Sequence, residues 1–491
     1  MKIISCFVRE QKRYNKNQLK SLFSYDENDV ENFIRILKSY GILKAVKNNS
    51  EQLDLSDLIE EDIEIAEESS GSDSWLYVFK YVGVVVIGSR IIKCYPKYLL
   101  SKSENDVSLA QDMRQIIKVI EKYHNSCEQI INMHFNNGEI NNFNILAIIL
   151  YILNDYYENG VYSNSEDIIE LNGEGSILWD RTINDGFAIF KNDKPYYIDT
   201  FTYKCIEDDE DYFKRLHECV ITSCSRQLKK CHLEEMFEIE PVFLTDEHIE
   251  DFGDKEYVLD RLSKELNMQY NTRRQILLKT IYAYIANDGK LIDENNCISM
   301  FGTTAFNMVW EKVCSEVYNN KLNVSISSLH MKKDLRPYYK KYSKLIDIIE
   351  KPLWYCDDLI KESKDTLIPD IVSTCQKNDE DYFIILDAKY YNLQLEKERM
   401  LKGNPGISDI TKQYLYQLSF KKFLSDHEIK NVRNCFLMPT EKNKIINKGC
   451  VSLKMMKNLG LEDINIRLIP AKEVFYKYLS GKHMDLFDLE L

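Results

Sequence analysis

Two apolar runs separated by a short polar segment stand out in the C-terminal third of the chain. They span residues 367–372 and 383–390 and are rich in β-branched and aromatic residues. The polar residues 376–381 between them favour a turn, so the pattern predicts two adjacent antiparallel strands. Side chains alternate between the two faces of a strand, which places Asp387 and Lys389 on the same face.

Asp370, at the end of the first run, adds a second carboxylate to this face. Mg²⁺ prefers oxygen ligands and retains several waters, so the two acids predict a magnesium site. Lys389 beside such an ion can position or deprotonate a water, while the ion neutralises charge on a phosphate. The arrangement suits phosphodiester hydrolysis. The alternative is an edge hairpin in which Asp387 and Lys389 form a solvated ion pair.

The order of these residues resembles a known nuclease signature. Pro369-Asp370 followed by Asp387-Ala388-Lys389 is similar to the PD-(D/E)XK motif, with Asp in the variable acidic position. The resemblance implies catalysis by Asp370, Asp387 and Lys389, with Mg²⁺ held by Asp370, Asp387 and the carbonyl group of Ala388. It also implies an α/β (α+β) fold with a central mixed sheet flanked by helices.

Helical patterns precede and follow the two predicted strands. Residues 306–318 have apolar positions at helical spacing, and the resemblance makes Glu311 a further carboxylate near the metal. Residues 409–418 form the second pattern, in which Gln413 or Lys412 is expected to orient the lysine or contact phosphate. Each helix has a plainer interpretation, as a solvated acid on the first and an ordinary amphipathic surface on the second. The remaining expected elements are strands at 431–439 and 464–470 and a helix at 471–479.

Length and composition restrict the class of protein. A chain of 491 residues is too long for one hydrophobic core, so two or three domains are expected. No apolar run reaches the length of a bilayer, and the first residues are too soon charged for a signal peptide. These features predict a cytoplasmic protein with no membrane contact. Thirteen cysteines without a CxxC pair indicate reduced thiols.

Charge is distributed unevenly along the chain. The net charge of −14 argues against a protein that binds nucleic acid over its whole surface. Residues 51–73 are acidic and favour a linker, whereas residues 321–344 carry seven Lys or Arg against one Asp. The basic stretch indicates either contact with the phosphate backbone or a solvated helix face.

The first half of the chain contains several further patterns. Residues 17–47 indicate two helices and a strand that are similar to a winged helix, and residues 75–98 indicate three short strands. Long helices are expected within 108–158 and 255–290. His217, Cys224 and Cys231 recur every seven residues, but one helix cannot wrap such ligands around zinc, so they are expected in the core.

The amino-acid sequence of the β-rich region resembles that of McrC-type and LlaJI-type restriction subunits. The resemblance rests on YVGVVVIG at 81–88, IIKCYPKY at 91–98 and the glycine-bearing segment 171–183. It implies a restriction (phage-defence) endonuclease subunit that cleaves double-stranded DNA together with a McrB-like AAA+ GTPase. No nucleotide-binding motif occurs in the sequence, so GTP is assigned to the partner.

This resemblance also implies a division of the chain into three parts. Residues 1–74 are the winged-helix-like segment and acidic linker, residues 75–295 the partner-binding region, and residues 296–491 the nuclease domain. Asp180 and Arg181 are expected either on the partner contact or in a structural turn. Pairing of two nuclease domains would serve double-strand cleavage. The alternatives are a noncatalytic regulator of an AAA+ motor and a DNA-binding specificity module.

Overall fold

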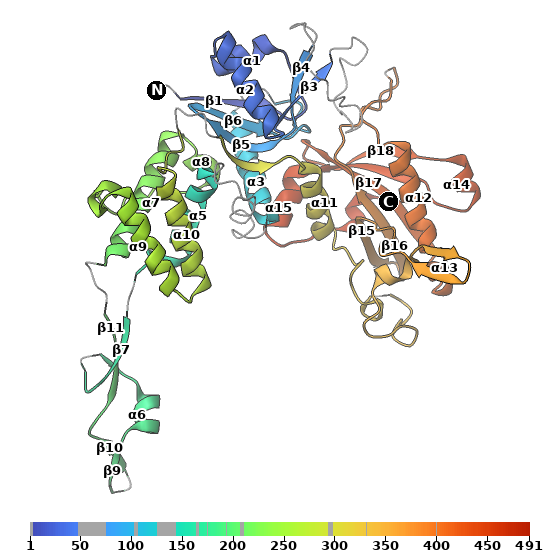
Figure 1. Ribbon diagram of the computed structural model, residues 1–491. Helices are drawn as coiled ribbons and strands as arrows, with labels where there is room; N and C mark the ends of the chain where they lie inside the picture. The colour runs from blue at the N-terminus through green and yellow to red at the C-terminus, as the bar shows by residue number, and fades with distance from the viewer. Residues whose placement is uncertain are drawn as a thin grey trace. The chain divides into compact units, whose positions relative to one another are not determined.

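The chain divides into two units, which are described separately (Figure 1). The computed structural model describes residues 3–47, 75–102, 107–124, 144–163, 166–173, 175–192, 194–206, 211–292, 298–329, 331–398 and 400–491. Unit 1 comprises Met1–Ile130 and Glu294–Leu491, and unit 2 comprises Ile131–Asp293. The expected acidic linker lies outside the described residues. Within the described part, no helix is long and apolar enough to cross a membrane.

A five-stranded mixed sheet forms the centre of the C-terminal part of unit 1. Its order is β15-β16-β17-β19-β18, in which β16, β17 and β19 are parallel and the two outer strands are antiparallel to their neighbours. The predicted strands at 431–439 and 464–470 are confirmed as β17 and β19, whereas β18 was not predicted. The bounds are β15 (Ile371–Lys377), β16 (Glu380–Ala388), β17 (Asn431–Thr440), β18 (Ile446–Val451) and β19 (Ile464–Pro470).

Helices cover both faces of this sheet, as expected for a mixed α/β fold. On one face, Tyr416 and Phe420 pack against Phe383 and Ile385 of β16. On the other face lie the helices that precede and follow the sheet, α11 and α15 (Figure 1). The three helices predicted from periodicity are confirmed. The bounds are α11 (Phe306–Val317), α12 (Ile407–Ser419), α13 (Lys421–Asp426), α14 (Lys454–Asn458) and α15 (Ala471–Leu479).

The N-terminal part of unit 1 contains two smaller sheets. One has the order β1-β6-β5-β12 and the other β2-β4-β3. The first sheet therefore combines strands from all three parts into which the sequence was divided. The bounds are β1 (Ile4–Arg9), β2 (Arg13–Tyr14), β3 (Leu43–Lys47), β4 (Trp75–Phe79), β5 (Val82–Ile87), β6 (Arg90–Tyr95) and β12 (Ile298–Thr303), and the helices are α1 (Lys16–Phe23), α2 (Glu27–Ser39) and α3 (Val107–His124).

A close approach of backbones explains two glycines in this sheet. Gly83 and Gly302 are direct partners on β5 and β12. A Cβ on Gly83 would lie 2.2 Å from the carbonyl oxygen of Phe301, and one on Gly302 would lie 2.2 Å from that of Val82. Only glycine fits at both positions. Gly83 thus lies inside β5, and the break between β4 and β5 falls at Lys80 and Tyr81.

The helix-then-strand pattern near residue 41 is also confirmed. Helix α2 ends at Ser39, and Gly41 adopts a left-handed conformation with φ of 67° before β3 begins. Glycine takes this conformation without a steric penalty, which allows the reversal. Phe33 and Leu37 of α2 pack in one core with Val85 and Ile92 of the neighbouring sheet.

The basic stretch 321–344 is not an α-helix in its described residues. It consists of turns and the 3₁₀ segment Ile326–Ser328, so the interpretation as a solvated helix face is wrong. Lys332 forms an ion pair with Asp379 at 2.5 Å, and Arg336 pairs with Asp334 at 2.9 Å. A second hairpin follows, formed by β13 (Leu353–Cys356) and β14 (Leu359–Glu362).

Helices form the body of unit 2, with bounds α5 (Ile145–Asn159), α7 (Tyr212–Lys230), α8 (Glu234–Phe237), α9 (Lys255–Met268) and α10 (Thr272–Ala286). An asparagine or aspartate caps the start of each of α5, α7, α9 and α10, and its side chain accepts a hydrogen bond from a backbone N–H group of the first turn. Arg273 binds Asp155 through two hydrogen bonds of 2.8 and 2.7 Å. His217, Cys224 and Cys231 are buried, as expected for core residues.

The burial of His217 makes unit 2 sensitive to acid. Its Nδ1 accepts a hydrogen bond from the Tyr162 amide at 2.9 Å, which requires the neutral imidazole. Burial lowers the pKa of His217 to about 4, below the ordinary value of 6.5. The unfolded chain therefore binds a proton first as pH falls. We expect unit 2 to lose about 3 kcal/mol of stability between about pH 6.5 and pH 4.

Denaturant unfolding between pH 4 and pH 7 measures this loss. His217→Gln, which cannot titrate, is expected to flatten the pH dependence of the unfolding midpoint. His232→Asn is the matched control, because His232 is exposed at the end of α7 and Asn tolerates its positive φ. A wild-type dependence that survives in His217→Gln would contradict the assignment.

Residues 166–206 of unit 2 form an arm of short strands and one helix (Figure 1). Among the described side chains from 169 to 203, only Thr182 and Thr202 are buried. Large apolar side chains are correspondingly exposed, Phe187 by 80% and Phe190 by 71%. The arm contains β7 (Glu166–Leu171), β8 (Ser176–Ile177), α6 (Trp179–Asp185), β9 (Ala188–Lys191), β10 (Lys194–Tyr197) and β11 (Phe201–Ile206).

Candidate active site

The pairing of β15 and β16 places two acids opposite each other. Ile371 pairs with Leu386, so Asp370 and Asp387 stand at the next opposed position, on the same face. The Asp370 carboxylate accepts a hydrogen bond of 3.0 Å from the Ala388 amide. Strand β15 begins one residue after Asp370 and continues to Lys377, later than the predicted 367–372. The turn is confined to Asn378 and Asp379, both with positive φ.

A loop after α11 fixes the start of β15. Asn320 donates a hydrogen bond of 2.8 Å to the carbonyl oxygen of Asp370 and accepts one of 3.0 Å from the Val372 amide. Both backbone groups flanking Ile371 are thus held by one side chain. These hydrogen bonds hold the backbone at Asp370 and thereby fix the position from which its carboxylate extends.

Asp387 is held in an environment that disfavours its charge. Its residue surface is only 3% exposed. Burial raises the pKa of Asp387 well above the ordinary value, and the hydrogen-bonded Asp370 carboxyl raises it further, against an opposing effect of Lys389. Two neighbouring carboxyl groups repel each other when both are ionised, so a bound cation would stabilise their charged forms.

Lys389 reaches from the end of β16 to two carboxylates. Its Nζ lies 3.0 Å from Oδ2 of Asp387 and 3.1 Å from Oδ1 of Asp409 on α12. Burial alone would lower the pKa of Lys389, but the two acids outweigh burial and raise it. The amine is therefore an ammonium in this arrangement. The backbone amide of Lys389 donates to the carbonyl oxygen of Leu437 at 2.9 Å.

Glu311 of α11 faces the same group of charges. Burial raises its pKa, Lys389 opposes the shift, and Asp387 and Asp409 reinforce it. The carboxyl of Glu311 is thus within electrostatic range of Asp387, Lys389 and Asp409. The structure thus brings together Asp370, Asp387 and Lys389 where β15 begins and β16 ends, and Glu311 of α11 interacts with them electrostatically.

A family profile described as LlaJI restriction endonuclease matches residues 81–472. The chain belongs to this family. A Bacillus subtilis (strain 168) protein named "Type II restriction enzyme BsuMI component YdjA" is 28% identical over 99% of this chain and 91% of its own length.

Two solved structures from Thermococcus gammatolerans are similar at low identity. One is a refined half-complex from the tetradecameric assembly of McrB AAA+ hexamers with bound McrC, with 13% identity, a TM-score of 0.37 and coverage of 97% of this chain and 99% of that chain. The other is the cryo-EM structure of the McrBC complex, with 11% identity, a TM-score of 0.24 and coverage of 63% and 85%.

In this LlaJI-family chain, Gln413 does not lie beside the lysine. Its side chain is fully buried and donates to the Ile385 carbonyl oxygen at 3.2 Å and to Asn434 at 3.4 Å. Lys412 is exposed on the surface of α12. The expected contact with Lys389 is made by Asp409 instead, one helical turn before Gln413. Asp409 was not predicted.

The donor set fits a hard cation. Asp370, Asp387 and the Ala388 carbonyl supply oxygen atoms, the ligand type that Mg²⁺ selects. Among the described residues, no three His, Cys, Asp or Glu side chains form a group that could hold a metal ion. Two acids are sufficient for Mg²⁺, which usually keeps waters and takes further oxygens from a substrate phosphate.

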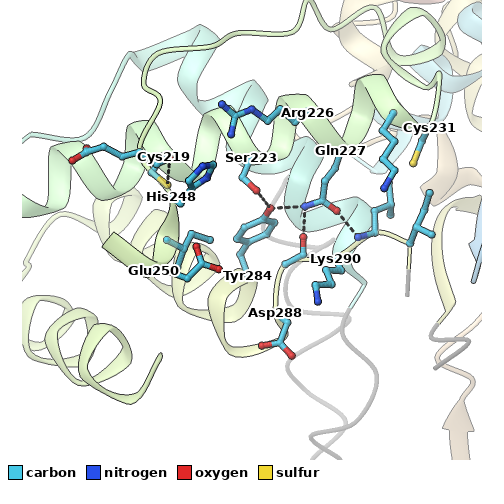
Figure 2. Close-up of a pocket in the computed structure, with 16 residues that line it drawn as sticks. Cys219, Ser223, Arg226, Gln227, Cys231, His248, Glu250, Tyr284, Asp288 and Lys290 are labelled. Carbon is cyan, nitrogen blue, oxygen red and sulfur yellow. Dashed lines mark hydrogen bonds between the residues drawn. The ribbon is translucent and has the colours of Figure 1, made fainter. Parts of the chain in front are cut away.

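A separate cavity lies in unit 2 and does not belong to the acidic site. It has a volume of about 380 Å³ between α7, α10 and residues 247–250 (Figure 2). The Tyr284 hydroxyl is bound to Ser223 at 2.9 Å and to Gln227 at 2.6 Å, and Gln227 also binds the backbone at Gly289 and Leu291. These contacts tie the loop after α10 to α7, which is a structural role.

Proposed function

We propose that this chain is the DNA-cleaving subunit of a restriction system and hydrolyses phosphodiester bonds in double-stranded DNA with Mg²⁺. One observation carries the proposal: two opposed carboxyl groups and a lysine converge where β15 begins and β16 ends. A site of this composition binds a hard cation and places an amine beside it. Membership of the LlaJI restriction endonuclease family supports the reaction class.

The roles of the residues follow from their contacts. Asp370, Asp387 and the carbonyl group of Ala388 would hold Mg²⁺. The bound ion supplies neutralisation of the charge that develops on the phosphate and activation of a water. Asp387 would then be engaged with the cation, and Lys389 retains Asp409 as its partner. Asp409 keeps the ammonium group of Lys389 directed toward the acids, where it can contact the attacked phosphate.

Glu311 and Gln413 have supporting roles in this proposal. Glu311 of α11 interacts electrostatically with Asp387 and Lys389 and would hold a water in the outer shell of the ion. Gln413 binds the backbone of β16 at Ile385 and thereby fixes α12, and with it Asp409, against the strand. The contact of Gln413 is structural, because its side chain is enclosed by the core.

The arm of unit 2 is our candidate contact with an AAA+ GTPase partner. Monomeric proteins rarely expose so many large apolar side chains in one segment. Trp179, Phe187, Phe190 and Ile198 are each more than half exposed. Asp180 and Arg181 follow Trp179 on α6. The Bacillus subtilis relative is named a component of a restriction enzyme, which supports a subunit that works with others. In this proposal GTP is bound by the partner.

Plasmid cleavage by the full chain tests the proposal, with and without the neighbouring motor subunit and with GTP, ATP and Mg²⁺ varied separately. We expect cleavage only with Mg²⁺, stimulated by the motor and GTP. Phe187→Ser with Phe190→Ser is expected to remove the stimulation. Tyr270→Ser is the control, because this side chain is 96% exposed in unit 2 outside the arm. An absence of cleavage under all combinations would refute the nuclease assignment.

A further inference from the structure

The residue that follows the candidate catalytic lysine is bound to the first strand of the chain. The Tyr390 hydroxyl donates a hydrogen bond of 2.6 Å to Oε2 of Glu10, which lies directly after β1. Both residues are buried, with 7% and 5% of their surfaces exposed. Glu10 lies outside the part of the chain matched by the LlaJI profile, residues 81–472. A contact across 380 positions thus joins the N-terminal sheet to the nuclease strand.

A second group completes this contact. The backbone amide of Lys97 lies 3.1 Å from Oε2 of Glu10 and 3.3 Å from the Tyr390 hydroxyl. The carbonyl oxygen of Lys97 accepts a hydrogen bond of 3.0 Å from Asn392. The loop after β6 is therefore hydrogen-bonded to the segment after β16 at two residues, Tyr390 and Asn392.

The ring of Tyr390 is held as firmly as its hydroxyl. The Lys97 ammonium lies 4.8 Å from the ring centroid, and the ring of Phe306, at the start of α11, lies 5.4 Å away. Tyr98 packs edge-on at 6.4 Å. Tyr390 thus meets the N-terminal part and α11 at once, so it has little freedom to change position.

Simple packing does not require a carboxylate at this place. Burying a polar group costs free energy unless it is hydrogen-bonded, and an apolar pair of similar size would fill the space. The Glu10–Tyr390 hydrogen bond is directional, so it fixes the orientation and the position of the tyrosine side chain. The backbone at Lys389 lies between two anchors: the hydrogen bond that its N–H group donates to the Leu437 carbonyl oxygen, and the hydrogen bond that Tyr390 donates to Glu10.

We propose that Glu10 and Tyr390 are positioning residues for Lys389, so that the N-terminal sheet is an integral support of the nuclease centre. The inference rests on the proposed function for its catalytic consequence. Any displacement of the Lys389 backbone also moves its ammonium group, because the side chain is attached to that backbone. A shift of about 1 Å in a catalytic group can lower the rate about 100-fold. A rearrangement of the N-terminal part would therefore reach the nuclease centre through Tyr390.

Three substitutions in the full chain test the link. Tyr390→Phe removes only the hydroxyl, Glu10→Ala removes the acceptor, and Glu10→Gln restores an acceptor oxygen of the same reach. We expect the first two to lower kcat for DNA cleavage by about 10–100-fold with KM unchanged, since the cluster is buried. Glu10→Gln is expected to recover most of the rate.

A second readout does not depend on cleavage. The rate at which an amine-reactive acylating reagent labels Lys389, followed by mass spectrometry without added metal, reports how firmly its ion pairs are held. We expect faster labelling in Tyr390→Phe and Glu10→Ala and the wild-type rate in Glu10→Gln. Tyr14→Phe is the matched control, because it removes another buried hydroxyl of the N-terminal part, one that binds the Arg9 amide.

The outcomes separate this inference from the proposed function. Wild-type labelling and cleavage in folded Tyr390→Phe and Glu10→Ala would overturn the link. If Tyr390→Phe does not fold, the contrast between Glu10→Ala and Glu10→Gln decides. A wild-type chain that never cleaves DNA refutes the nuclease assignment, whereas the labelling of Lys389 still supports or overturns the positioning by Glu10 and Tyr390.

Discussion

Asp387→Asn and Lys389→Ala are each expected to lower the rate of DNA cleavage by more than about 100-fold. Asn keeps the shape of Asp387 but removes the charge that would hold Mg²⁺ next to Asp370. Ala removes the only amine that contacts both Asp387 and Asp409 among the described ion pairs. A plasmid-nicking assay with the motor subunit, GTP and Mg²⁺ measures both losses.

The controls for this prediction come from the same hairpin. Asp379→Asn changes an acid at the turn, 81% exposed in its side chain, and should cleave as the wild type does. Lys389→Arg should not restore full activity, because a planar guanidinium cannot replace a compact ammonium held between two carboxylates. Circular dichroism and stimulation of the partner's GTPase should be unchanged in all variants. Cleavage at the wild-type rate by a purified Asp387→Asn, Lys389→Ala double variant would contradict the assignment.

The hairpin could be predicted from the sequence because its signals are local. Apolar runs, a polar turn and alternation of side chains are visible within 25 residues, and they placed Asp370 near Asp387 before any coordinates were known. The position of the first strand was less well determined. Pro369 and the contacts of Asn320 stop the pairing at Ile371, and Asn320 belongs to a distant loop that no local pattern connects to this strand.

Asp409 shows what a helical pattern can and cannot reveal. Asp409, Gln413, Tyr416 and Phe420 follow one stripe of α12 at spacings of four, three and four residues, and Phe420 packs on Phe383 at the other end of β16. Extending the apolar stripe by one turn would have placed Asp409 over Lys389. The resemblance drew attention to Gln413 instead, which the same stripe places over the middle of the strand.

The sheet that joins residues 4–9, 82–95 and 298–303 could not be derived from local patterns. Each strand is short, and strand pairing over hundreds of residues leaves no periodic signal in a single sequence. Buried polar contacts such as Glu10 with Tyr390 have the same property. Either residue alone reads as an ordinary side chain, and its role appears only when both ends of the contact are known.

Adding Mg²⁺ is expected to raise the melting temperature of unit 1, and Asp387→Asn is expected to raise it without the ion. The reason is the burial of Asp387 and its closeness to the Asp370 carboxyl, which together raise the pKa of Asp387. A group whose pKa is raised on folding destabilises the fold at pH values above that pKa, where it must ionise. Stability should therefore increase as pH falls from the raised pKa toward the ordinary value of 3.8, and neutralisation by Asn or by a cation should have the same effect at neutral pH.

The expected rise in melting temperature is large enough to test whether the acid pair binds Mg²⁺. Binding at a hundredfold excess over Kd contributes about 2.7 kcal/mol, and each kcal/mol raises the melting temperature of a domain by about 2–4 °C. Thermal melts of the wild type with Mg²⁺, compared with Na⁺ at equal ionic strength, should show this rise. Asp387→Asn and Asp370→Asn should start from higher midpoints and respond little to Mg²⁺. Asp379→Asn should respond as the wild type does, because Asp379 lies on the surface and its charge is not desolvated.

An equal rise in all four proteins would mean that the cation binds elsewhere. The catalytic role assigned to the acid pair would then be wrong as well.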